Sequence, residues 1–474
     1  MTTAYADFLA KKSQSGSDEG FPPLWIPDFL FDFQKHLVEW AVRGGRRAIF
    51  ADCGMGKTIC QLVFAENVVR KTNKRVLILT PLAVSYQTEA EAEKFGVEAH
   101  VARDGKPRRN ITITNYEQMA KFDSGDFVGV VCDESSILKH FGGATQKQVT
   151  RFMSKLPYRL LCTATAAPND YYELGTSSEV LGMLGHTDML SRFFVQEDSK
   201  RYRMNEVKIA RAARTGKHYA RLAYRVSQQI GQWRLKGHAE VPFWRWVCSW
   251  ARACRKPSDL GFTDDGFILP RLVERHHVIT PKTAPDGMLF VVPAFGLREE
   301  RDERRRTLEE RCGLIAELAD HKYPVLIFCD LNIEGDLIEK MIPDAVQVKG
   351  SDNDDFKEEA LLAFASGKIR VLDSKVKIAG FGMNFQHCAH VITFANHSWE
   401  RYYQGVRRCW RFGQKREVVV DVISTKGEQH VRDNMLRKSE AAAKMFDNLI
   451  IHMNDTMRIE RQRYDREMEV PRWL

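Results

Sequence analysis

The sequence lacks the patterns that mark membrane, secreted and zinc-binding proteins. Its longest apolar runs, such as VLILT at 76–80, are far shorter than the about 20 residues that a membrane-spanning helix needs. No CxxC pair occurs among the ten cysteines, so neither a zinc ribbon nor a CxxC redox site is indicated. The first 20 residues hold no apolar stretch of signal-peptide length. These absences predict a cytoplasmic protein with reduced thiols and no membrane partner.

Two local patterns have ordinary explanations. His387, Cys388 and His390 lie too close together in the sequence for a metal site and lack a second pair of ligands, so no structural metal is predicted there. The charged run REERDERRRTLEERC at 298–312 is typical of a solvated helix face.

The positive charge is concentrated in one segment. The chain of 474 residues carries a net charge of +9, whereas the stretch from Lys200 to Lys256 alone has fifteen lysines and arginines against two acids. Such a basic stretch attracts a polyphosphate backbone, so nucleic acid is the predicted partner. The alternative is a helical insert with solvated arginines. The segment also holds four of the nine tryptophans, which we expect in a core because large aromatic side chains are usually buried: Trp233, Trp244, Trp246 and Trp250.

Apolar strand-like runs alternate with helix-like segments in two regions of the chain. The first alternation runs from Arg46 to Thr165 and the second from Val325 to Ile423. Continuously apolar strands separated by crossover-length helices predict parallel sheets covered on both faces. The predicted organisation is an N-terminal arm at 1–29, a first α/β domain at 30–185, a basic, Trp-rich and mainly helical insert at 186–297, a second α/β domain at 298–430, and a charged helical tail at 431–474.

The segment ADCGMGKT at 51–58 has the composition of a phosphate-binding loop between a strand and a helix. Gly54 and Gly56 would let backbone N–H groups approach phosphate oxygens at the start of the helix. Lys57 would reach the β- and γ-phosphates, and the Thr58 hydroxyl would bind Mg²⁺. Ala51 stands where the full motif has glycine, and a plain strand-to-helix turn is the alternative.

Two carboxylates follow the apolar run VGVVC, within DESS at 133–136. Ligands of parallel sheets bind at the carboxyl ends of the strands, so this pair is predicted to lie at the ligand edge. Asp133 would hold Mg²⁺ through water, and Glu134 would orient and deprotonate the attacking water.

The segment QGVRRCWRFGQ at 404–414 supplies arginines from the second α/β region. Arg408 and Arg411 are three residues apart, and we expect them on one face of a helix. From there they would reach the γ-phosphate as arginine fingers. A solvated surface pair of arginines is the alternative.

Taken in order, these segments resemble helicase superfamily two, and within it the Swi/Snf-type DNA translocases of the kind encoded by bacteriophages and prophages. The resemblance covers roughly residues 30–175 and 310–430. It implies two RecA-like domains in tandem, with ATP and Mg²⁺ in the cleft between them. It also implies that Gln34 recognises adenine and that Gln404 acts with Arg408 and Arg411.

The same resemblance assigns further positions to nucleic-acid contact or to the coupling of hydrolysis to movement. They are Pro81, Asn115, Tyr116, Thr163, Thr165, Gly380, Gly382 and Asn384. The chain departs from the family pattern at two places. Ser136 stands where a coupling histidine is usual, and Lys375 with Val376 replaces a Ser-Thr pair before the glycine-rich motif.

The sequence therefore predicts an ATP-dependent translocase or helicase that moves along duplex DNA, with single-stranded DNA or RNA as other possible tracks. One alternative is a strand-separating DNA or RNA helicase. Another is a nucleotide-gated, nucleic-acid-binding scaffold for phage replication or recombination, which would not need Glu134 or the two arginines.

Overall fold

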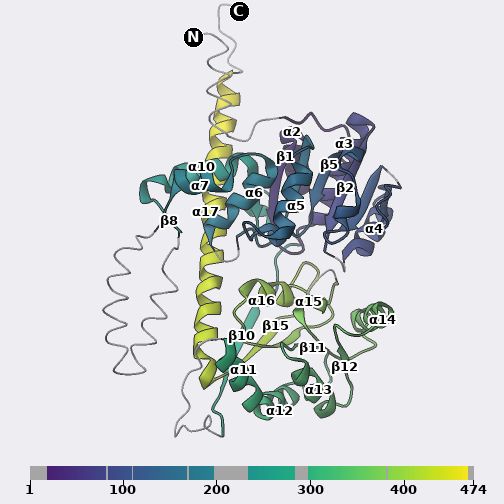
Figure 1. Cartoon of the computed structure of the whole chain (residues 1–474), viewed down its shortest axis with the longest axis vertical. Coiled ribbons are helices and arrows are strands. Elements are labelled where there is room, and N and C mark those ends of the chain that lie inside the picture. The colour runs from purple at the N-terminus through teal and green to yellow at the C-terminus, as the bar shows by residue number, and fades with distance from the viewer. Residues whose placement is uncertain are drawn as a thin grey trace, which may run out of the picture.

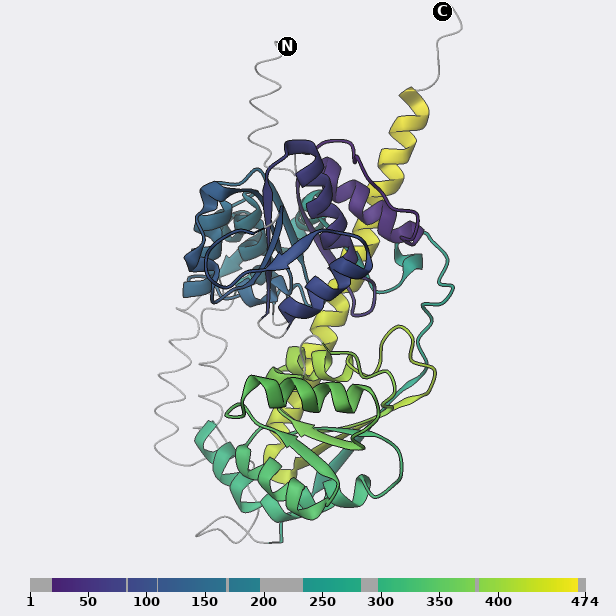
Figure 2. The ribbon, with the colours of Figure 1, turned by 90° about the vertical axis from the view of Figure 1, so that its right-hand side faces the viewer.

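The computed structural model describes residues 19–81, 84–108, 110–167, 170–196, 233–282, 297–379 and 383–467. Within these residues the chain forms two α/β domains, each built on a sheet whose strands are all parallel (Figures 1 and 2). The prediction of two parallel-sheet α/β domains in tandem is confirmed. Both sheets are built from apolar runs, such as β2 (Arg75–Thr80), in which five of six residues are buried.

The first sheet has seven strands in the order β3-β4-β2-β5-β6-β1-β9. Their bounds, in sheet order, are Ala99–Val101, Ile111–Asn115, Arg75–Thr80, Phe127–Cys132, Tyr158–Cys162, Arg46–Ala51 and Ala251–Cys254. The helices of this domain are α2 (Asp32–Gly44), α3 (Lys57–Thr72), α4 (Ser85–Lys94), α5 (Ala144–Met153), α6 (Leu174–Leu181), α7 (His186–Phe193) and α10 (Glu240–Trp250). A short antiparallel pair, β7 (Phe194–Gln196) and β8 (Trp233–Leu235), lies beside them.

The second sheet has six strands in the order β10-β15-β14-β11-β13-β12. Their bounds, in sheet order, are Leu272–Ile279, Val418–Thr425, His390–Phe394, Val325–Phe328, Val371–Ser374 and Ala345–Val348. The helices of this domain are α11 (Leu297–Arg306), α12 (Leu308–Leu318), α13 (Asn332–Met341), α14 (Asp354–Ala365), α15 (Val376–Ala379) and α16 (Trp399–Val406).

The predicted insert at 186–297 is divided between the two domains over its described residues. Strand β9 pairs in parallel with β1 at the edge of the first sheet, and β10 pairs in parallel with β15 at the edge of the second. The tryptophans Trp244, Trp246 and Trp250 of α10 are buried in the core of the first domain, as expected. Helix α10 and β9 pack with the first sheet and β10 pairs with the second, so the described residues of 186–297 do not form a separate unit. Residues 197–232, which hold most of the basic segment, lie outside the described part of the chain.

The charged run at 298–312 is solvated on one side only, where the exposed residues are Glu299, Arg301, Asp302, Arg305 and Glu309. The other side is buried. Arg311 and Glu334 are fully buried and form an ion pair with an Nη1–Oε1 distance of 2.7 Å. Arg304 bonds to Asp330 and to Glu428 at 2.9 and 2.7 Å. The helices α11 and α12 pack against the second sheet, and their arginines find carboxylates there, which is the condition under which buried charge is tolerated.

Helix α17 (Gln429–Glu467) joins the two domains. Met435, near its start, is buried in a core of the second domain, whereas Phe446 and Met453, further along, are buried in the core of the first. Figures 1 and 2 show the helix running along both domains. The predicted tail at 431–474 is therefore, over this part, an element shared by both cores. In the described residues no helix is both long and apolar enough to cross a membrane.

Candidate nucleotide site between the two domains

The phosphate-binding loop joins β1 to the start of α3. Gly54 and Gly56 have φ values of +87° and +77°, a region that glycine adopts without strain. The helix begins at Lys57, so its first backbone N–H groups point out of the loop and favour an anion. The Nζ of Lys57 donates to the carbonyl oxygens of Ala51 and Asp52, at 2.9 and 3.2 Å. The predicted loop thus has the backbone that phosphate binding requires.

Lys57 is placed among acids. Burial lowers its pKa, but the negative charges of Cys53, Glu134 and Asp133 outweigh that effect, and the net result is a raised pKa. Lys57 therefore stays a cation at the loop. The other predicted ligand, the hydroxyl of Thr58, lies close enough to the carboxyl group of Glu91 on α4 to act against the burial that raises the pKa of Glu91.

Gln34 of α2 lies against the loop. Its Nε2 donates to the carbonyl oxygen of Met55 at 3.1 Å, and its Oε1 accepts from the backbone N–H of Phe31 at 3.1 Å. A Cβ at Gly56 would lie 2.2 Å from that Nε2, so the Gln34 amide would have to move to accept any other residue there. The amide predicted to recognise adenine is thus held beside the phosphate loop by α2.

Asp133 follows β5 directly and is buried. Its Oδ1 accepts from Nε2 of Gln61 on α3 at 2.6 Å, and its backbone carbonyl accepts from the hydroxyl of Tyr116 at 2.6 Å. Burial raises the pKa of this carboxyl group, while the Gln61 hydrogen bond and the positive charge of Lys57 act in the opposite direction. The Oδ1 atom is thereby held by the Gln61 amide, and the carboxylate fits a Mg²⁺ ion bound through water.

Glu134 adopts φ +46° and ψ +51°, a left-handed conformation that is rare for a residue with a side chain. Its Oε2 accepts from the hydroxyl of Thr163 at 3.3 Å. Burial raises the pKa of Glu134; Lys57 and Arg408 oppose that effect, and Asp133 and Glu400 add to it. A carboxyl group with a raised pKa suits a general base, and strained backbone of this kind often occurs at functional sites.

The arginines of the second domain do not lie on a helix, in contrast to the prediction. Helix α16 ends at Val406, and Arg408 and Arg411 lie in the turns that follow. Gln414 holds these turns in place, since its Nε2 donates to the carbonyl oxygens of Gln386, Cys388 and Cys409.

Both arginines are nevertheless turned toward the first domain. Arg408 is close enough to Asp133 and Glu134 to lower their pKa values. Burial lowers the pKa of Arg411 to about 10, and the neighbouring Arg408 adds to the effect. The Nε atoms of both arginines are buried and bond to none of the described residues. Buried cationic donors without an acceptor call for an anion, so the residues fit a bound triphosphate.

A contact that the sequence reasoning missed joins the phosphate loop to the end of α16. Nη2 of Arg407 donates to Oδ2 of Asp52 at 2.6 Å and to the carbonyl oxygen of Cys53 at 2.9 Å, and the Tyr403 hydroxyl donates to the other oxygen of Asp52. Asp52 and Arg407 are 9% and 2% exposed. We call these three residues, Asp52, Tyr403 and Arg407, the phosphate-loop contact. A Cβ at Gly54 would lie 3.0 Å from the backbone nitrogen of Phe412, so the second domain packs directly on the loop.

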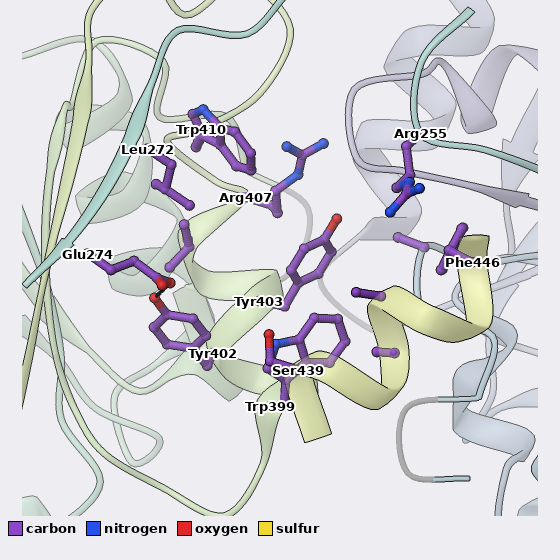
Figure 3. Close-up of a pocket in the computed structure, with 14 residues that line it drawn as sticks. Arg255, Leu272, Glu274, Trp399, Tyr402, Tyr403, Arg407, Trp410, Ser439 and Phe446 are labelled. Atoms are coloured by element: carbon purple, nitrogen blue, oxygen red, sulfur yellow. Dashed lines mark hydrogen bonds between the residues drawn. The ribbon is translucent and has the colours of Figure 1, made fainter. Parts of the chain in front are cut away.

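Tyr403 and Arg407 also line a cavity of about 280 Å³. Figure 3 shows it between α16, the middle of α17 and β10, with the rings of Trp399 and Tyr403 side by side. The Tyr402 hydroxyl donates to Glu274 of β10 on another wall. The cavity lies where the packing of α17 passes from one domain to the other.

A second contact joins α16 to two residues of the first domain, one just after the acidic segment 133–136 and one just after β6. Nζ of Lys139 pairs with Oε2 of Glu400, and the hydroxyl of Thr165 donates to Oε1 of Glu400 at 3.3 Å. We call Lys139, Thr165 and Glu400 the acidic-segment contact. A sequence signal existed for Thr165 alone, because it belongs to the CTAT segment.

The remaining predicted residues are spread more widely. Asn115 and Tyr116 are buried behind the carboxylate pair, Gln404 is buried on α16, and Asn384 is exposed. Pro81 follows β2 and is partly exposed. Gly380 and Gly382 lie outside the described residues. Lys375 bonds through Nζ to Asn332 at 2.5 Å, so this departure from the family pattern is tied to α13.

The chain matches one protein-family description and is similar to solved structures. No curated protein sequence matches the chain. Among solved structures, the chain is similar to the Sulfolobus solfataricus SWI2/SNF2 ATPase core in complex with dsDNA, with 16% identity and a TM-score of 0.38 over 92% of this chain and 96% of that one. Residues 307–413, which run from the start of α12 to the turns that carry the two arginines, match the family described as the helicase conserved C-terminal domain.

Proposed function

We propose that this chain is an ATPase that hydrolyses ATP between its two parallel-sheet domains and uses the accompanying domain movement to travel along duplex DNA. One observation carries the proposal. The phosphate loop and the carboxylate pair of the first domain face Arg408 and Arg411 of the second, whose Nε atoms are buried and bond to none of the described residues. The helicase-domain match over 307–413 supports the same reading.

Each group then has a role that its surroundings favour. ATP with Mg²⁺ would supply an electrophilic γ-phosphoryl group to this site. Lys57 and the amides at the start of α3 bind phosphate oxygens, and Thr58 with Asp133 holds the cation. Glu134 takes a proton from water at its carboxylate, and Arg408 with Arg411 neutralises the negative charge that develops.

Duplex DNA is proposed as the track on the basis of charge. The stretch from Lys200 to Lys256 has thirteen more positive than negative side chains, and the remainder of the chain is net negative. Charge of this density binds phosphate backbones without reading sequence, which is what movement along DNA requires. The proposed role of the nucleic-acid motifs, including Asn384 and the glycines at 380 and 382, belongs to the same hypothesis.

The test is ATP hydrolysis measured without nucleic acid and with duplex DNA, single-stranded DNA or RNA. We expect the largest stimulation by duplex DNA. Glu134→Gln should lower turnover by about 10²–10⁴-fold, as expected for loss of a general base. A rate that no nucleic acid changes would refute the translocase. Release of a labelled strand from a duplex would instead favour the strand-separating alternative.

A further inference from the structure

Ser136 is the starting point, because a coupling histidine is usual at that place in the family that the chain resembles. Here Ser136 is buried, and its carbonyl oxygen accepts from the backbone N–H of Lys139 at 3.2 Å. The turn η4 (Ser135–Leu138) thereby ends with Lys139 directed at the second domain. Lys139 therefore provides the polar link between the acidic segment and the second domain.

The acceptor on the other side is Glu400, in the first turn of α16. There its negative charge is favoured by the helix N-terminus, and its two oxygens bond to Lys139 and to Thr165. The side chains of Lys139 and Glu400 are 17% and 13% exposed, so water screens the pair only in part. Glu400 therefore receives two contacts from the first domain at one carboxylate.

From Glu400 a continuous series of hydrogen bonds leads to the catalytic glutamate. Thr165 donates from its hydroxyl to Glu400, and its backbone N–H donates to the Thr163 hydroxyl at 3.0 Å. The Thr163 hydroxyl in turn donates to Glu134 at 3.3 Å. Each link joins side chains that are buried or partly buried, and a displacement at either end must break or lengthen at least one of them.

Helix α16 also connects Glu400 to the two arginines. Helix α16 is eight residues long, about 12 Å, and Arg408 follows its end by two residues. A short helix moves as a rigid body, so a shift of Glu400 against the first domain shifts Arg408 and Arg411 against the phosphate loop. Lys438 of α17 also lies near Glu400 and Lys139, and its Nζ is engaged by the carbonyl oxygen of His397 at 2.9 Å.

We infer that Glu400 is a positioning residue, which couples the movement of the second domain to Glu134 through Lys139 and Thr165. This role rests on the proposed ATPase function and assigns a regulatory contact within it. Glu400 itself touches neither the phosphate loop nor Asp133 in the described structure. Glu400 therefore acts indirectly, because it controls when the two arginines lie opposite the carboxylate pair.

A charge-reversal cycle tests the inference. Lys139→Glu and Glu400→Lys each place like charges in contact, and the double variant restores an ion pair of opposite polarity. We expect each single variant to lower the kcat of nucleic-acid-stimulated hydrolysis about tenfold, the usual size of a coupling between sites, with the KM for ATP nearly unchanged. The double variant should recover most of the loss. Lys155→Glu and Glu339→Lys, at exposed positions, are the matched controls.

The outcomes separate the inference from the function on which it rests. If no nucleic acid stimulates ATP hydrolysis by the wild-type protein, the translocase is refuted. The variants would then be compared by domain closure, measured by small-angle X-ray scattering with a non-hydrolysable ATP analogue. Stimulated wild-type protein with fully active single variants would overturn the role of Glu400 alone. A double variant whose kcat is no higher than that of the single variants would also overturn this role. A contact that matters only for folding shows no rescue specific to kcat.

Discussion

Helix α16 touches the first domain at both of its ends, and the two contacts differ in burial. At its end, the phosphate-loop contact pairs Arg407 with Asp52, both almost completely buried. At its start, the acidic-segment contact pairs Glu400 with Lys139, both partly open to water. The loss of one partner should destabilise the protein more at the buried pair than at the pair that water partly reaches.

The difference assigns distinct roles to the two ends. The buried contact fixes where α16 meets the phosphate loop, and Arg407 is held further by Trp410, whose ring lies 4.7 Å from the guanidinium. The partly exposed contact can break and form again as the domains move. The arginines Arg408 and Arg411 lie directly after the buried end, so their position relative to the loop is set there first.

The largest effect is expected for Arg411→Ala. If the phosphate-loop contact holds α16 in place, the loss of Arg411 removes charge stabilisation without opening the domains. Turnover should fall by about 10³-fold or more, while ATP affinity stays within severalfold. Single-turnover hydrolysis and titration with a fluorescent ATP analogue measure the two quantities. Arg416→Ala, at an exposed position in the same segment, is the control; weakened binding equal to the loss of turnover would contradict the separation of roles.

The buried contact is tested next by Asp52→Ala. This change leaves the guanidinium of Arg407 buried without its carboxylate, and the free energy of unfolding should fall by about 3–5 kcal/mol. Urea unfolding measures it. The double variant Asp52→Ala with Arg407→Met removes both charges and should regain a large part of the loss. A single variant as stable as the wild type would show that α16 is not anchored at this end.

Tyr403→Phe probes the same contact with a smaller change. It removes one hydrogen bond to the Asp52 carboxylate, and the expected loss of stability is about 1.5–3 kcal/mol. Tyr402→Phe is a close control, since its hydroxyl bonds to Glu274 within the second domain. Both variants should lose stability in urea, but only Tyr403→Phe should alter ATP affinity. Equal effects on affinity would mean that the two tyrosines act only through folding.

The smallest effect is expected for Lys139→Ala at the partly exposed end. Its ion pair with Glu400 is more exposed than the Asp52–Arg407 pair, so the free energy of unfolding should fall by less than the about 3–5 kcal/mol expected for Asp52→Ala. The contribution should shrink further in 1 M salt, where charges are screened within about 3 Å. Urea unfolding at low and high salt measures both. A loss as large as that of Asp52→Ala would remove the contrast between the two ends of α16.

Much of the fold was predictable because the strands are local patterns. Runs such as those of β2 and β11 are continuously apolar, and their burial on both faces requires a parallel sheet with helices around it. Strand β9 was not predictable in this way. Its four residues, ARAC, include Arg252, which is buried over the ring of Trp40 at 4.5 Å, and nothing local marks such an arginine as part of a sheet.

The residues of the candidate site also fall into those that the sequence predicted and those that it did not. The glycines of the phosphate loop and the carboxylates after β5 stand at places that a strand end and a helix start define, so motif spacing located them. The helix predicted for Arg408 and Arg411 was wrong, because α16 ends at Val406 and the chain continues in turns. Asp52, Arg407 and Glu400 carried no signal that sequence reasoning recognised.

The sequence by itself determined the two α/β halves, the phosphate loop and the acidic pair, because these depend on apolar periodicity and on residues a few positions apart. Only the tertiary structure decided which arginine meets which partner. Asp52 and Arg407 are 355 positions apart, and their contact exists because two separate sheets, joined by α17, bring the end of α16 onto the phosphate loop. Side-chain pairing across a domain interface depends on that packing, and no local pattern encodes it.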